Sequence, residues 1–126
     1  MELEHVRLVK ETELFKNCTN IVIGKGNVNA DILFVGEAPG RKEDLEGVPF
    51  VGAAGKNLDK LLEKVGLTLE DIYVANILKC RPPGNRDPKP DEIVQCVGFL
   101  HEQLLLIQPE IIVALGAHAA KTLLDT

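Results

Sequence analysis

The chain alternates short, continuously apolar runs with longer stretches of helical periodicity. The apolar runs lie at residues 21–23, 31–35, 71–76 and 109–115, and turn-forming residues border them. Runs of this length without a polar face are typical of strands that are buried on both sides, as in a parallel sheet. These four runs are therefore predicted to be strands.

Amphipathic helices are predicted between these strands. One begins at about Ala53 and ends before Gly66; another begins at Pro90 and a third at Ala117, whereas the N-terminal segment has only a weak helical pattern. The apolar face of the first helix consists of Ala54, Leu58, Leu61, Leu62 and Val65. That of the second consists of Ile93, Cys96, Val97, Leu100, Leu104 and Ile107.

Alternation of strands and helices indicates an α/β fold. The sequence predicts a three-layer α/β/α arrangement with a central, mostly parallel sheet, folded as a single domain over residues 1–126. In such sheets, ligands bind outside the carboxyl ends of the strands. The candidate sites are therefore the three loops that follow Val35, Asn76 and Leu115.

The composition is that of one ordinary domain: 126 residues, 45% of them hydrophobic. The longest apolar runs are far shorter than the roughly 20 residues of a membrane span, and the N-terminus does not resemble a signal peptide. We therefore expect no membrane association and a cytoplasmic protein. Cys18, Cys80 and Cys96 form no C-x-x-C pair, which favours small buried thiols in a reducing compartment over a disulfide scaffold.

Five sequence segments occur in the order found in the family 4 uracil-DNA glycosylases. They are GEAPGRKED (36–44), PFVGAAG (49–55), VAN (74–76), KCRPPGNR (79–86) and IVALG (112–116). Over residues 19–126 the chain resembles this family, whose members flip uracil out of DNA and hydrolyse its N-glycosidic bond in base excision repair. The resemblance implies that the partner is uracil-containing DNA, and we expect a monomer.

The resemblance places Phe50 and Asn76 in uracil recognition, with Gly36 and Ala38 in the pocket wall. A carboxamide suits this role because its oxygen accepts from uracil N3–H while its NH₂ donates to O4, a pattern that cytosine does not match. Phe50 would stack on the base. The alternatives are an asparagine that only caps the strand exit and a phenylalanine that plugs the loop onto the core.

Two acidic residues are the catalytic candidates. By resemblance, Glu37 lies near the catalytic water and the sugar, and Glu43 forms a steric gate against the 5-methyl group of thymine. Either residue could instead be a solvated loop carboxylate. Ala38 stands where a better-known glycosylase family carries a catalytic aspartate, so we expect the chemistry to depend on positioning and electrostatics.

The net charge of −5 argues against a generic nucleic-acid binder, which relies on many basic contacts to phosphate. Basic residues do cluster in one short stretch, at Lys79, Arg81, Arg86 and Lys89. This proline-rich loop is either a solvated loop or the DNA contact surface. The residues predicted to contact DNA are Lys79, Arg81, Gly84, Asn85 and Arg86.

The chain departs from the family in its cysteines. Family members hold a 4Fe-4S cluster on four thiolates, two of them a C-x-x-C pair near the N-terminus. Cys80 and Cys96 match the other two positions, but Val9 and Thr12 stand near the expected pair, and Cys18 falls on a position that is not a ligand. We therefore expect no stable cluster and no other cofactor.

The resemblance also implies a further strand and a His-Pro-Ser segment, which the 126 residues do not contain, so we expect a C-terminally truncated domain. His118 is not the histidine of that segment and is interpreted as a helix-terminal residue. An alternative function is a non-catalytic or weakly active module that binds uracil or single-stranded DNA. A nucleotide-binding transferase is disfavoured because no G-x-G-x-x-G follows Val35 and the chain has no P-loop.

Overall fold

The computed structural model describes residues 18–85 and 87–124. Three predicted helices are present and begin where expected, at Ala53, Pro90 and Ala117. The elements in chain order are β1 (Lys25–Gly26), β2 (Ile32–Gly36), α2 (Arg41–Glu46), α3 (Ala53–Lys64), β3 (Ile72–Asn76), the 3₁₀ turn η2 (Pro83–Asn85), α4 (Pro90–Ile107), β4 (Ile111–Ala114) and α5 (Ala117–Leu124).

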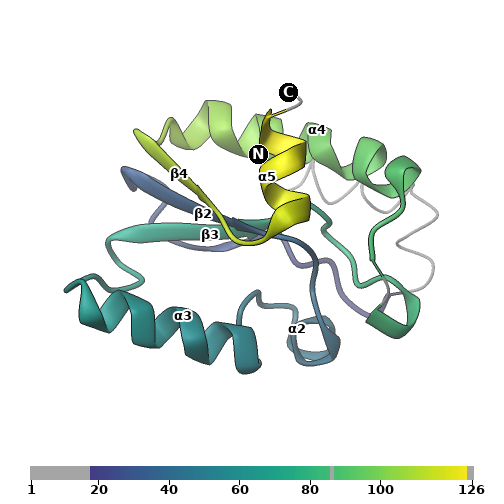
Figure 1. Cartoon of the computed structure of the whole chain (residues 1–126), viewed down its shortest axis with the longest axis horizontal. Helices are drawn as coiled ribbons and strands as arrows, with labels where there is room; N and C mark the ends of the chain where they lie inside the picture. The colour runs from purple at the N-terminus through teal and green to yellow at the C-terminus, as the bar shows by residue number, and fades with distance from the viewer. Residues whose placement is uncertain (1–17, 86, 125–126) are drawn as a thin grey trace.

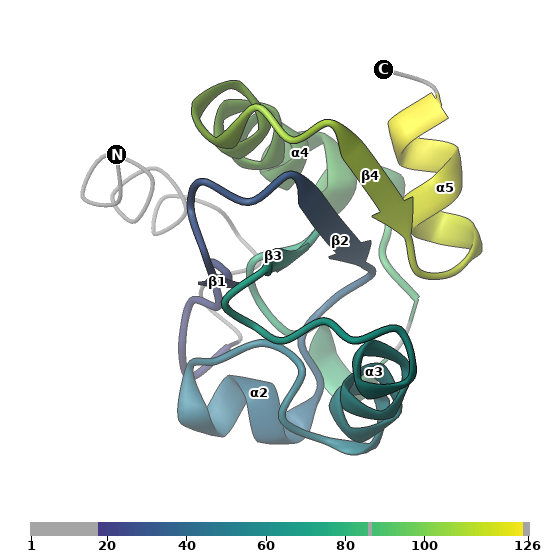
Figure 2. The same ribbon diagram turned by 90° about the vertical axis from the view of Figure 1, so that its left-hand side faces the viewer.

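The strands form one sheet in the order β1-β3-β2-β4. β2 pairs in parallel with both β3 and β4, whereas the short β1 pairs antiparallel with β3. Figure 1 shows α2 and α3 on one side of the sheet and α4 and α5 on the other, and Figure 2 shows β4 at the sheet edge next to α5. The predicted three-layer fold with a mostly parallel sheet is confirmed.

Helices cover both faces of the sheet. Successive residues of β2 and β3 therefore point alternately into two separate cores, one on each face. The core on the side of α4 and α5 includes Leu33, Val35, Tyr73, Ala75, Cys96, Phe99, Leu100 and Ala119. The core on the side of α3 includes Phe34, Leu58, Leu62, Ile72 and Val74. This double coverage explains why the strand sequences lack a polar face.

Two strand predictions need correction. Residues 21–23 do not form a strand; the Val22 N–H donates to the Lys79 carbonyl oxygen at 2.7 Å, beyond the end of β3, where no ladder continues. β4 was expected to be buried on both faces, yet Ile111 and Ile112 are 54% and 43% exposed. The reason is that β4 is an edge strand of the described sheet and pairs only with β2.

The helical regions also differ in detail from the predictions. The loop at residues 36–55 contains the helix α2, which its many glycines concealed. On α3, Leu58 and Leu62 are buried, but Leu61 and Val65 are exposed, so the core-facing stripe is narrower than predicted. None of the helices in the described residues is long and apolar enough to cross a membrane.

Lys79 was predicted to lie on a basic surface, and this prediction is wrong. The side chain is 1% exposed, and its ammonium nitrogen donates to the carbonyl oxygens of Ile23 (3.3 Å) and Asn76 (2.9 Å) and to Gln103 Oε1 (2.6 Å). Three acceptors satisfy the three N–H donors, but burial still lowers the pKa of Lys79 to about 7. Lys79 therefore links the end of β3 to α4 from inside the protein.

This burial makes stability depend on pH in a defined direction. Between pH 7 and about 10, the unfolded chain keeps Lys79 protonated and the folded chain does not, so the free energy of unfolding should rise with pH. In urea titrations under reducing conditions, wild type should gain up to about 4 kcal/mol relative to Lys79→Met over this range. The exposed-site variant Lys60→Met should follow wild type, and parallel curves for wild type and Lys79→Met would contradict the shift.

Candidate functional site

The three candidate loops meet at one end of the sheet. Gly36 at the end of β2 lies opposite Asn76 at the end of β3, and the Leu115 N–H after β4 donates to the Val35 carbonyl oxygen at 2.8 Å. Together with α3, these loops line a cavity of about 400 Å³. Its lining includes Gly36, Glu37, Ala38, Phe50, Asn76 and Leu115. A smaller hollow of about 80 Å³ adjoins Ala38, Glu43, Phe50 and Asn76.

Gly36 permits a close approach of Asn76 and Phe50. A Cβ atom on Gly36 would lie 2.5 Å from Asn76 Oδ1 and 2.6 Å from Phe50 Cζ. Both separations are shorter than van der Waals contact, so a side chain at this position would displace the ring, the carboxamide or both. The predicted neighbours Gly36, Phe50 and Asn76 are therefore brought together, and a glycine is required between them.

Phe50 adopts a backbone conformation that phenylalanine rarely takes. Its φ of 56° lies in the left-handed region, which costs a residue with a Cβ atom about 1–2 kcal/mol. Its carbonyl oxygen lies against the start of α3, where a Cβ on Gly55 would collide with it, and accepts from Lys25 Nζ at 3.3 Å. These contacts hold the half-buried ring at the boundary of both hollows.

Asn76 is 4% exposed. Its backbone oxygen accepts from Lys79, but among the described residues its carboxamide has no hydrogen-bond partner. A buried carboxamide without a partner is costly, and such groups in native proteins require an explanation. The carboxamide lines the cavity, so a ligand there could supply the missing donors and acceptors.

Glu43 holds the loop that carries Phe50. Its Oε2 accepts from the N–H groups of Val51 (3.0 Å) and Gly52 (2.7 Å), and its Oε1 accepts from Gly40 N–H (2.9 Å). Backbone donors therefore engage both carboxylate oxygens, which gives Glu43 a positioning role. A direct part for Glu43 in catalysis or in excluding thymine stays a prediction.

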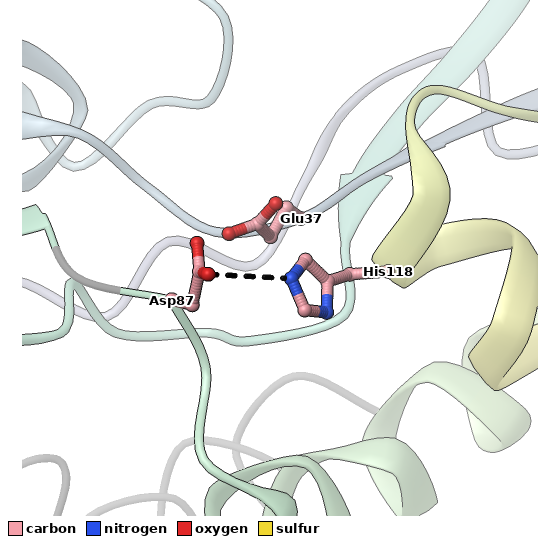
Figure 3. Close-up of side chains that lie close together, drawn as sticks. All are labelled: Glu37, Asp87 and His118. Carbon is pink, nitrogen blue, oxygen red and sulfur yellow. Dashed lines mark ion pairs between the residues drawn. The ribbon is translucent and has the colours of Figure 1, made fainter.

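Glu37 lies beside two residues that the sequence analysis did not place in the site. Figure 3 shows its carboxylate facing Asp87, from the loop after β3, and His118, from the first turn of α5. Asp87 Oδ2 lies 3.8 Å from His118 Nε2. Two carboxylates and an imidazole thus gather next to the cavity.

The predicted DNA-contact residues do not form one basic surface. Lys79 is buried, Arg81 is half-buried, and Lys89 is exposed at the start of α4. Gly84 lies in the exposed turn η2, where its φ of 66° suits glycine, and Asn85 closes that turn. Arg86 lies outside the described residues. Phosphate contact by the other residues of this loop therefore stays a prediction, and Lys79 is excluded from it because it is buried.

The cysteines do not fit the cluster of the family. Four thiolates hold a 4Fe-4S centre, but the sequence has three cysteines, and the position of the expected N-terminal pair lies outside the described residues. Cys80 and Cys96 are completely buried, and burial raises the pKa of the Cys96 thiol. A hydrogen bond between Cys18 and Cys80 lowers the pKa of Cys18 and raises that of Cys80. At neutral pH, Cys80 and Cys96 are therefore buried thiols rather than thiolates.

Topology could have identified the missed residues. Asp87 and His118 each lie in or directly after a loop at the carboxyl end of a strand, as Glu37 does. Because β3, β2 and β4 are adjacent and parallel, these loops converge. Locally, Asp87 is one residue of a proline-rich loop and His118 stands at the start of a helix, so neither has a sequence signal of a site on its own.

Comparison with known proteins gives consistent matches. Residues 23–126 match the family model described as the Uracil DNA glycosylase superfamily. The Type-4 uracil-DNA glycosylase of Archaeoglobus fulgidus is 55% identical over 112 residues, which are 89% of this chain and 56% of that protein. Those of Saccharolobus solfataricus and Thermotoga maritima are each 48% identical, over 95% and 97% of this chain and 56% and 64% of their own lengths. The chain therefore spans just over half to almost two thirds of these relatives.

The bonding of Glu43 predicts that Glu43→Gln loosens the Phe50 loop. The amide keeps one oxygen and turns an NH₂ toward backbone N–H groups that need an acceptor, so about 1.5–3 kcal/mol of local stability should be lost. Hydrogen exchange at Val51 and Gly52, or at Gly40 if the amide is flipped, should accelerate by about 10- to 100-fold in NMR measurements. Glu46→Gln, on the exposed end of the same helix, is the control. Unchanged exchange at all three amides would remove the positioning role.

Proposed function

The chain belongs to the uracil DNA glycosylase superfamily, and from this membership and the cavity we propose that it excises uracil from DNA. In this reaction water adds to C1′ of the deoxyribose as the N-glycosidic bond breaks, and uracil leaves with the bonding electrons. The observation that carries the proposal is the Asn76 carboxamide, which is 4% exposed, lines the cavity and has no partner among the described residues.

Recognition of the flipped base rests on two side chains that meet at Gly36. The Asn76 carboxamide would accept from uracil N3–H and donate to O4, which satisfies a group that is otherwise buried without partners. The Phe50 ring borders the same hollow and would stack on the base. Cytosine presents a lone pair at N3 and an amino group at C4, so it would oppose both Asn76 contacts.

Catalysis would then depend on the placement of charge. Glu37 lines the cavity, where its carboxylate would orient the attacking water and stabilise positive charge on the sugar in the transition state. No lysine is among the described residues that line the cavity, so we propose direct hydrolysis without a covalent sugar–enzyme intermediate. Glu43 contributes by holding the Phe50 loop in place, because its carboxylate accepts hydrogen bonds from backbone N–H groups of that loop. Its role therefore differs from that of Glu37.

We further propose that the protein acts without an iron–sulfur cluster and as a monomer on uracil-containing DNA. The mismatch between three cysteines and four thiolate ligands supports the first point.

The test combines base excision with a variant of the base-reading residue. Wild type should release uracil from a uracil-containing oligonucleotide, seen on a gel as strand scission after alkali treatment. Asn76→Asp should reduce excision on the order of 100-fold or more, because a carboxylate cannot donate to O4 and leaves the base mispaired. The matched control is Asn57→Asp, an exposed position on the rim of the same cavity, which should retain activity close to wild type.

Two outcomes would contradict this proposal. Binding of uracil-containing strands without any base release by wild type would identify a binding module instead of an enzyme. Equal loss of activity in both aspartate variants would show that negative charge in the cavity, rather than base reading by Asn76, explains the effect.

The loop after β3 should provide the phosphate contact. Replacing Arg81 and Arg86 together by alanine should weaken binding about equally for uracil-containing and normal strands and lower the salt slope by roughly 1 to 2. The control replaces Lys60 and Lys64, two exposed residues in the second half of α3, and removes the same charge from an element outside the loop after β3. A loss confined to uracil release, with DNA binding intact, would instead place the two arginines in the pocket.

A further inference from the structure

Three side chains from three separate loops converge beside the cavity. They are Glu37 after β2, Asp87 after β3 and His118 in the first turn of α5 (Figure 3). One carboxylate oxygen of each acid and one ring nitrogen of the histidine all lie within 4.8 Å of one another. This convergence follows from the parallel order β3-β2-β4, which places the ends of these strands side by side.

The electrostatics of this group favour a cation. Two carboxylates at this separation repel each other, and Asp87 Oδ2 also lies 3.8 Å from His118 Nε2. That distance exceeds hydrogen-bond length, and the pair is largely in solvent, with side-chain exposures of 84% for Asp87 and 37% for His118. A divalent cation between the two carboxylates would replace this repulsion with attraction.

We propose that Glu37, Asp87 and His118 bind a divalent transition-metal ion. Two carboxylate oxygens and one imidazole nitrogen suit Mn²⁺, Co²⁺ or Zn²⁺, whereas Mg²⁺ and Ca²⁺ prefer oxygen ligands alone. Ligand atoms on one ion are at most about 4.2 Å apart for bonds of about 2.1 Å. The three atoms must therefore draw together slightly, and the exposed Asp87 and half-exposed His118 side chains can make this adjustment.

Three protein ligands leave coordination positions open. Water or an oxygen of an added anion can occupy these positions. The proposed ligand set contains no cysteine, because the three ligands are two carboxylates and an imidazole. The proposed metal site is also independent of uracil excision, because all three ligands are side chains of the protein and no substrate group takes part.

Manganese is the appropriate probe because Mn²⁺ avoids buried thiols, which Zn²⁺ would also seek. Protein freed of metal should take up about one Mn²⁺ per chain, measured by the loss of the free-ion signal in electron paramagnetic resonance. Asp87→Asn and His118→Asn should each weaken binding on the order of 10-fold or more. Asp87→Asn is isosteric and His118→Asn shortens a partly exposed side chain, and thermal melts followed by circular dichroism check that the fold is kept.

Matched controls are Asp59→Asn on the exposed face of α3 and His101→Asn on α4, which should bind Mn²⁺ like wild type. No uptake by wild type at about millimolar Mn²⁺, or uptake that survives unchanged in both site variants, would overturn the proposal. Equal weakening in the controls would also overturn it, because the ion would then be bound by general surface charge. None of these results depends on glycosylase activity, so failure of the metal site and failure of the proposed function are distinguishable.

Discussion

The site depends on two parallel strands that end side by side at a residue without a side chain. The register of β2 and β3 places Gly36 opposite Asn76, and the missing Cβ leaves room for both the carboxamide and the Phe50 ring. The rest of the fold keeps Gly36, Asn76 and Phe50 together. The apolar faces of β2 and β3 fix the register between two helical layers, and Glu43 holds the returning loop by three backbone hydrogen bonds.

Buried polar contacts extend this arrangement into the core. The ammonium group of Lys79 joins the carbonyl of Asn76 to Gln103 on α4, so the end of β3 is tied to the helical layer opposite α3. Asp44, also buried, accepts from the N–H groups of Thr19 and Asn20 and fixes the chain that enters the sheet. Both charged residues are buried and serve the fold, so neither contributes its charge to the protein surface.

The sequence predicted the layers of the fold because hydrophobic periodicity reflects burial, and burial follows from the sheet. The resemblance to the glycosylase family placed Phe50, Asn76 and Gly36 in one pocket, and the paired ends of β2 and β3 do bring these residues together. Prediction from the sequence failed where an answer depends on neighbours distant in sequence. Lys79 looks like a surface residue until Gln103 is placed beside it, and β4 looks buried until its position at the sheet edge is known. The roles of Glu37 and Glu43 were likewise inseparable from sequence, because a carboxylate's hydrogen-bond partners have no local signal.

The left-handed backbone of Phe50 has a kinetic consequence. Glu43 and the close packing against Gly55 maintain this unfavourable conformation in the folded chain. Its cost of about 1–2 kcal/mol therefore reduces the stability of the folded chain. Under the proposed function, a flipped base would meet an aromatic ring whose loop is already held in place, so capture of the base would require no rearrangement of this loop.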